Sequence, residues 1–167
     1  HAGLGVTAIG IAGLMAWQVE DIRIAREGET YTVDAFGPWQ YDVRLNEVNR
    51  VQGPNYISTM ASIDVMRGDR LVAHLEPEKR VYPVAGMPTT EAAIDNGFLR
   101  DVYVVIGDPQ ENGGWAVRTF IKPLANWIWA GCIIMAIGGC FSLTDRRYRV
   151  AAGARKAAAA PAGVPAE

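Results

Sequence analysis

The sequence is poor in cysteine and in net charge. Its 167 residues include two cysteines and 16 basic against 18 acidic side chains, a formal net charge of −2. A net charge close to zero gives no sign of the basic patch that nucleic-acid-binding proteins use, so we expect no nucleic-acid partner. Cys132 and Cys140 lie in one apolar run, at a spacing typical of neither a disulfide framework nor a zinc site. We expect both to pack as small buried side chains.

Common catalytic motifs are absent as well. The sequence has no nucleophile elbow, phosphate-binding loop or metal-spaced cluster. Glu91, Asp95 and Asp101 form no recognisable acid–base pair. His74 falls at a polar strand position, where we expect a solvent-facing side chain without a metal. The charged residues between 76 and 80 are typical of a solvated strand edge. The residues alone therefore predict no enzyme.

Two runs lack charged residues altogether. The run over residues 124–143 is long enough, at ~1.5 Å per helical residue, to cross a bilayer core ~30 Å thick. Arg146, Arg147 and Arg149 follow it, and such a basic excess marks the cytoplasmic side of a membrane. We therefore expect a transmembrane helix that ends in the cytoplasm. A buried helix of a soluble protein is the alternative.

The other uncharged run covers residues 1–17. As a helix it is only ~24 Å long, so we expect a transmembrane helix whose missing turns precede His1. A signal peptide with a cleavage region over residues 12–16 is the alternative, although no basic stretch precedes the apolar core. Since the second helix is expected to end in the cytoplasm, the region between the two helices should face the bacterial periplasm.

Residues 18–123 alternate between apolar and polar side chains with the period of two that is typical of half-buried strands. They predict a mainly β fold: a small antiparallel periplasmic β sandwich or barrel, flanked by the two transmembrane α-helices. Thr90–Asn96 is expected to form one helical turn, with Thr90 as its N-cap. Residues 144–167, rich in alanine and proline towards their end, are expected to be a disordered cytoplasmic tail. The predicted strands are Asp21–Ala25, Tyr31–Val33, Tyr41–Asn46, Ala61–Val65, Leu71–Leu75, Val102–Ile106 and Trp115–Ile121, with a hairpin turn at Gly68 and Asp69.

His1 is the candidate site residue. An imidazole within a membrane helix is costly unless it meets a partner, and neutral imidazole is a common axial ligand of haem iron. A stripe of small residues follows on the same helical face, which lets another helix or a flat macrocycle approach closely. Plain helix packing beside an exposed terminal histidine is the alternative, and the spacing leaves both open. The stripe consists of Gly5, Ala8, Ala12 and Ala16.

Five strings of the sequence resemble the end of the CcmF/NrfE family of cytochrome c biogenesis proteins. The resemblance covers nearly the whole chain except the alanine- and proline-rich tail. The strings are QVEDIRIAREGE, VQGPNYISTMASIDVMR, LEPEKRVYPVAGMPTTEAAIDNGFLRDVYVVIGD, GWAVRTFIKPLANWIWAG and LTDRRYR.

The resemblance implies a haem lyase component of the bacterial inner membrane. Such proteins take haem from the periplasmic haem chaperone CcmE and attach it to the cysteines of a CxxCH motif in apocytochrome c, which CcmH-type partners keep reduced. The family also binds a haem b between two histidines of its membrane helices. The resemblance makes His1 one of these axial ligands, with the second ligand outside this chain. The fragment alone is therefore expected to be inactive.

A function of another class stays open beside this one. The region over residues 18–123 could serve as a membrane-anchored periplasmic β domain that binds or assembles proteins without contact to haem. The two readings differ at His1, which the binding module leaves without a role. A purely structural domain that stabilises the membrane bundle is a third option.

Overall fold

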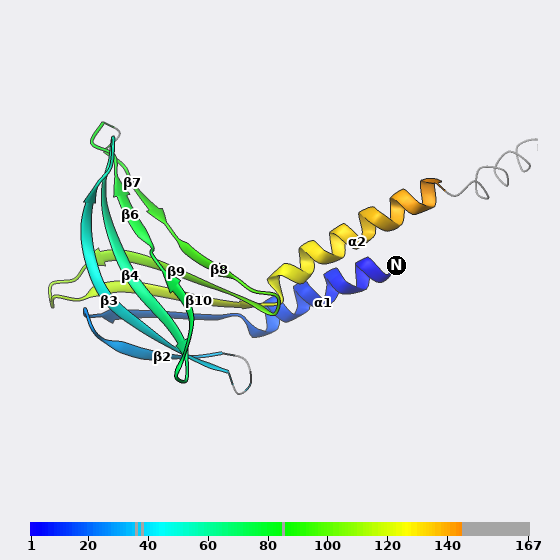
Figure 1. Ribbon diagram of the computed structural model, residues 1–167, viewed down its shortest axis with the longest axis horizontal. Helices are drawn as coiled ribbons and strands as arrows, with labels where there is room; N and C mark the ends of the chain where they lie inside the picture. The colour runs from blue at the N-terminus through cyan, green and yellow to red at the C-terminus, as the bar shows by residue number, and fades with distance from the viewer. Residues whose placement is uncertain (36, 38, 85, 145–167) are drawn as a thin grey trace, which may run out of the picture.

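A computed structural model of the chain describes residues 1–35, 37, 39–84 and 86–144 (Figure 1). Nearly all of the predicted tail lies outside these residues. The mainly β prediction is confirmed. In chain order the elements are α1 (Ala2–Trp17), β1 (Val19–Ala25), β2 (Thr30–Asp34), β3 (Gln40–Gln52), β4 (Ile57–Arg67), β5 (Arg70–Leu75), β6 (Glu78–Val81), β7 (Pro88–Glu91), β8 (Ala93–Asn96), β9 (Arg100–Pro109), β10 (Trp115–Pro123) and α2 (Ala125–Thr144).

The strands form two antiparallel sheets. One has the order β1-β10-β9-β8, and the other has the order β2-β3-β4-β6-β7 with β5 also paired to β4. Alternate side chains of each sheet point into one shared core, as the period of two requires. Leu45 and Ile63 enter this core from the larger sheet, and Val104 and Ile121 enter it from the smaller one; each is at most 1% exposed. All seven strands predicted from the sequence are present.

On the side opposite β3, strand β4 pairs with two different strands along its length. Its first part pairs with β6, where Ser58 lies opposite Arg80, and its later part pairs with β5, where Val65 lies opposite Ala73. The predicted hairpin at Gly68 and Asp69 is confirmed, because Arg67 pairs with Arg70. Gly68 has φ +59°, a left-handed conformation that glycine adopts without a Cβ penalty.

The predicted helical turn over Thr90–Asn96 is wrong. These residues belong to β7 and β8, and the chain crosses from the larger sheet to the smaller one between Glu91 and Ala93. Pairing of Thr90 with Lys79 and of Ile94 with Tyr103 outweighs the local capping signal. The charged segment over residues 76–80 is not a sheet edge either, since β6 is hydrogen-bonded to β4 on one side and to β7 on the other.

Helices α1 and α2 lie side by side and project together from one end of the sheets (Figure 1). They approach so closely that Gly3, Gly10 and Gly131 are buried between them. A Cβ atom on Gly131 would lie 2.6 Å from the Gly3 carbonyl oxygen. Small residues thus let the two backbones meet, as they do in membrane helix pairs. The expected burial of Cys132 and Cys140 is wrong within this chain, because both are exposed on α2.

Candidate functional site

His1 precedes the first turn of α1, at the end of the helix pair farthest from the sheets (Figure 1). Its carbonyl oxygen accepts a hydrogen bond from the Gly5 N–H at 3.2 Å, so its backbone joins the helix. Its side chain makes no capping hydrogen bond and is exposed. The imidazole is therefore free to meet a group that approaches from outside this chain.

The face of α1 that carries His1 points away from α2. Helical spacing of about 100° per residue places Gly5, Ala8 and Ala12 on the same side as His1. All three are exposed, and a Cβ atom on Gly5 would meet nothing within 4 Å. Sequence reasoning did not identify the face that packs against α2, which is formed by Gly3 and Gly10 instead, with Gly13 against Leu124 just before α2. The predicted stripe stays open for another helix or a macrocycle.

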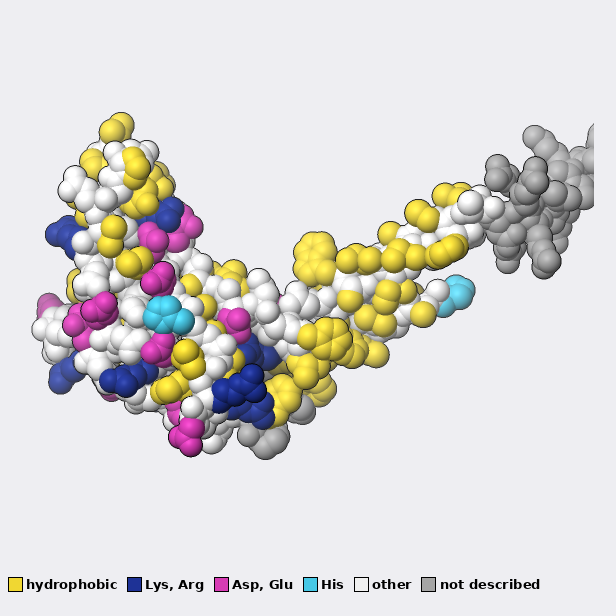
Figure 2. Space-filling model, viewed as in Figure 1, with side chains coloured by type: hydrophobic (Ala, Val, Ile, Leu, Met, Phe, Trp, Pro, Cys, Tyr) yellow, Lys and Arg dark blue, Asp and Glu magenta, His cyan; other side chains and the backbone are white. Residues whose placement is uncertain are grey.

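His74, the second histidine of the sequence, lies far from His1 on β5 (Figure 2). Its Nδ1 is 2.6 Å from Asp64 Oδ1, and its Nε2 is 3.7 Å from Glu76 Oε1. The hydrogen bond with Asp64 raises the pKa of His74 and lowers that of Asp64. This side chain is thus an exposed partner of two carboxylates. The described residues contain no group of three or more possible ligands that could hold a metal ion.

The turn between β8 and β9 joins the sheets to the first turn of α2. Asn126 Nδ2 donates to the Gly97 carbonyl at 2.7 Å and to Asp101 Oδ1 at 2.9 Å. Trp127 Nε1 donates to the Phe98 carbonyl at 3.1 Å, and the Leu124 N–H donates to the Leu99 carbonyl at 2.9 Å. The helix start is therefore held by side-chain and backbone bonds together.

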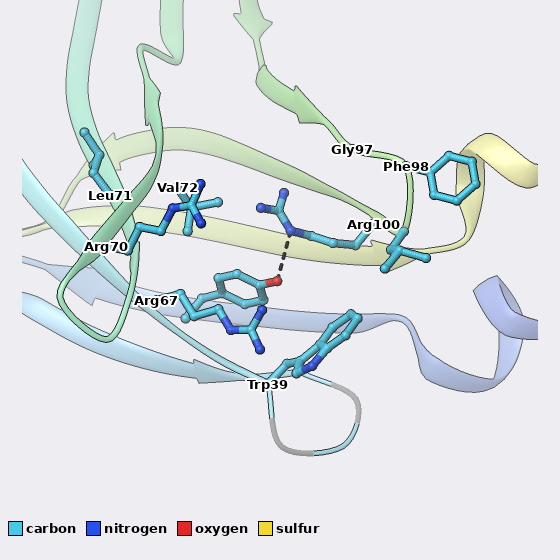
Figure 3. Close-up of a pocket in the computed structure, with 10 residues that line it drawn as sticks. Trp39, Arg67, Arg70, Leu71, Val72, Gly97, Phe98 and Arg100 are labelled. Atoms are coloured by element: carbon cyan, nitrogen blue, oxygen red, sulfur yellow. Dashed lines mark hydrogen bonds between the residues drawn. The ribbon is translucent and has the colours of Figure 1, made fainter.

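A groove of about 450 Å³ opens beside this junction (Figure 3). Its walls carry three arginines from three strands, together with Trp39 and Tyr41. Arg100 Nε donates to the Tyr41 hydroxyl at 3.0 Å, and the Arg67 guanidinium lies 5.3 Å from the centre of the Trp39 ring. Sequence reasoning missed this site because Arg67, Arg70 and Arg100 come together only through the pairing and packing of β4, β5 and β9. No local motif signals it.

These sites provide binding chemistry. An exposed imidazole can ligate a metal centre brought by another part of a protein, and guanidinium groups can bind anions. Neither site, within the described residues, couples a nucleophile to a base.

A family model described as "CcmF C-terminal beta-sandwich" matches residues 16–123. The chain is 60% identical, over 97% of its length, to the cytochrome c-type biogenesis protein ccl1 of Rhodobacter capsulatus, of which it covers 24%. It is 44% identical, over 90% of its length, to CcmF of Pseudomonas aeruginosa, of which it covers 22%. It is 32% identical, over 89% of its length, to NrfE of Haemophilus influenzae, of which it covers 23%.

A solved structure of the cytochrome c haem lyase CcmF shares the fold. It matches with a TM-score of 0.61 at 15% sequence identity, over 86% of this chain and 23% of that one. The chain thus spans about a quarter of the length of the relatives that it matches. The two sheets, the matched family model and these relatives agree with the resemblance drawn from the sequence, and the chain belongs to the CcmF C-terminal β-sandwich family.

Proposed function

We propose that this chain is the C-terminal part of a CcmF-like haem lyase component. The whole protein takes haem from the periplasmic chaperone CcmE and attaches it to the CxxCH cysteines of apocytochrome c, with a CcmH-type partner that supplies them reduced. Each thiol adds across a vinyl group, so a C–S bond forms and the thiol proton moves to the neighbouring vinyl carbon. Family membership over residues 16–123 is the observation that carries this proposal.

The chain's own placement would be in the inner membrane. Helix α2 is, among the described residues, the helix long and apolar enough to span a bilayer, and α1 is a shorter apolar helix of 16 residues. The domain scheme follows from this: membrane segments over residues 1–17 and 124–143, a periplasmic sandwich over residues 18–123, and a cytoplasmic tail over residues 144–167. The close seam of glycines between the helices supports a membrane pair, because apolar burial alone does not drive association in lipid.

His1 would be one axial ligand of a haem b. It fits this group, since its imidazole is exposed on a helix face of small residues that α2 leaves uncovered. A six-coordinate haem b can carry or store one electron, and the second ligand would come from another part of the full-length protein. The other histidine of this chain is already paired with Asp64 on the sandwich. Residues 1–167 alone are therefore expected to be inactive.

Absorption spectra of the full-length parent, oxidised and reduced, test the role of His1. Substitution His1→Ala is expected to abolish the low-spin haem b signal while the protein stays folded. His74→Ala is the matched control, because it removes the other histidine without touching α1. An unchanged spectrum in the His1 variant would remove this residue from the haem site, while the family assignment would stand.

A protein-binding module without haem contact is the second candidate. The tip between β6 and β7 favours it, because Val84 and Met87 are fully or largely exposed there, at 102% and 69%. Deletion of residues 20–120 from the parent separates the two candidates. The lyase proposal expects cytochrome c maturation to fail with the haem b spectrum retained. A pure assembly role expects the partner proteins to dissociate as well.

A further inference from the structure

The arginine groove lies at the level where α2 leaves the sandwich. Its lining residues Phe98 and Leu99 are the ones whose carbonyls accept hydrogen bonds from Trp127 and Leu124. The close-up shows Arg67, Arg70 and Arg100 around this groove, and Phe98 lies on its side nearest the start of α2 (Figure 3). If α2 spans a membrane, as proposed above, the groove therefore opens at the interface between bilayer and water.

The groove is positively charged and only partly neutralised. Arg100 forms an ion pair with Asp95, at 2.7 Å, and bonds to Tyr41. Arg67 stacks on Trp39, and no carboxylate of the described residues lies within ion-pair distance of Arg67 or Arg70. Lys and Arg atoms gather on this part of the molecular surface, beside the apolar helices (Figure 2). Guanidinium groups bind phosphate in a planar, two-pronged manner, and they stay charged at every physiological pH.

The rim of the groove is apolar. Phe98, Leu99 and Leu71 are exposed at 74%, 45% and 55%. Exposed aromatic and aliphatic side chains of this kind are suited to the layer where headgroups meet acyl chains. Phe98 and Leu99 lie on the side of the helices, where a groove for an acidic peptide would not need apolar side chains. The combination of arginine-lined walls with this rim matches a ligand that has an anionic head and an apolar tail.

We propose that this groove binds the headgroup of an anionic phospholipid, such as phosphatidylglycerol. The phosphate would lie between Arg67 and Arg70, with Arg100 beneath it on Tyr41, and the acyl chains would run past Phe98 along the helix pair. The volume of the groove lies within the range of about 300–1,000 Å³ typical of small-ligand sites. A lipid held here would fix the sandwich against the membrane surface. This role is independent of haem transfer.

The test uses the full-length parent in detergent, titrated with short-chain phosphatidylglycerol or phosphatidylcholine and followed by native mass spectrometry. Wild type should prefer phosphatidylglycerol. The variant R67Q/R70Q should lose about fivefold in affinity for each arginine removed, since a basic residue near an anionic lipid contributes about 1 kcal/mol. R50Q is the matched control, because Arg50 lies near the end of β3 and does not line the groove. It should bind like wild type. L71D, which adds a charge at the exposed rim, should weaken binding of phosphatidylglycerol alone.

Equal binding of the two lipids, or unchanged binding by R67Q/R70Q, would overturn the proposal. Competition by glycerol phosphate as effective as that by the lipid would also overturn it, because the site would then serve soluble phosphates. So would loss of a partner protein from R67Q/R70Q with its lipid preference intact, which would assign the groove to an acidic polypeptide. Carbonate washing of membranes checks the placement separately. Release of the parent would contradict both the placement and the lipid site, whereas retention without a lipid preference contradicts only the latter.

Discussion

The hydroxyl of Tyr31 lies 3.1 Å from the hydroxyl of Thr119, and both side chains are buried. Tyr31 belongs to β2 in the larger sheet and Thr119 to β10 in the smaller one. Burial raises the pKa of Tyr31, although the bond to Thr119 opposes the shift. This pair is a polar link through the core, and it ties together strands that are 88 residues apart in the sequence.

Removal of one hydroxyl of this pair is expected to destabilise the fold even when the shape of the side chain is kept. Thr119→Val preserves the volume of the side chain but leaves the Tyr31 hydroxyl buried without its hydrogen-bond partner, a loss of about 1–3 kcal/mol in the free energy of unfolding. The double variant Y31F/T119V should cost less than the sum of the single changes, by about 1 kcal/mol. Denaturant titration of the chain in detergent measures all three. Thr30→Val, at an exposed position of β2, should be close to neutral, and additive costs would show that the two hydroxyls do not interact.

Gly131→Ala is expected to separate the two helices. The new methyl group would lie 2.6 Å from both the Gly3 carbonyl oxygen and the Thr7 amide nitrogen, which are backbone atoms that cannot rotate away. Overpacking of this kind costs about 1–3 kcal/mol. Thermal stability of the chain in detergent reports the loss. Gly138→Ala is the matched control on the same helix, since nothing lies within 4 Å of its added methyl group. Equal effects of the two changes would refute the close seam.

Asn126→Ala is expected to loosen the start of α2. The variant loses the hydrogen bonds from the Asn126 side chain to the Gly97 carbonyl and to Asp101 Oδ1. Asp101 Oδ1 then keeps the Gly97 N–H, at 3.1 Å, as its remaining partner. Hydrogen exchange should accelerate at the Gly97–Leu99 turn, while exchange in β3 and β4 stays slow. The loss in stability should be about 1–3 kcal/mol. Asn49→Ala, on the exposed side of β3, should leave the turn protected. Slow exchange in both variants would mean that Trp127 and Leu124 suffice to hold it.

His74 should titrate above its ordinary pKa of 6.5, mainly because of its hydrogen bond with Asp64. A raised pKa in the folded chain means that the stabilisation is complete below 6.5 and is lost as the pH rises through the folded value. Asp64 behaves in the opposite sense, since its pKa is lowered: its stabilisation is present above 3.8 and is lost as the pH falls through the folded value.

Histidine resonances in NMR spectra of the chain measure this titration, and with two histidines the assignment needs one variant, His1→Ala. Asp64→Asn should return the pKa of His74 towards 6.5. Asp21→Asn should leave it raised, because Asp21 lies on β1 and pairs with Arg23 instead. A wild-type value at or below 6.5 would contradict the pairing.

Much of the sheet structure could be predicted because it depends on local alternation. Val102, Val104 and Ile106 point inward at every second position, so the period of two identifies both the strand and its buried face. Thr90–Asn96 has no such run, and its capping residues resemble a helix start. Its true structure depends on the pairing of Thr90 with Lys79 and of Ile94 with Tyr103, which no local pattern indicates.

The candidate sites also differ in whether a local sequence signal reveals them. His1 could be identified as a candidate because one residue within an apolar run carries the signal by itself. The side of α1 that packs on α2 could not, since small residues occupy both faces and the sequence does not say which meets a partner. The arginine groove could not either, because it requires the register of β4 against β5 and the placement of β9 behind them.

The joints between helices and sheets are short and paired. Gln18 alone separates α1 from β1, and Leu124 alone separates β10 from α2, while Val19 of β1 pairs with Ile121 of β10. No slack linker exists at either joint to absorb a movement. A tilt or rotation of the helix pair would therefore move β1 and β10, and with them the smaller sheet. The helix carrying His1 and the smaller sheet are therefore mechanically coupled.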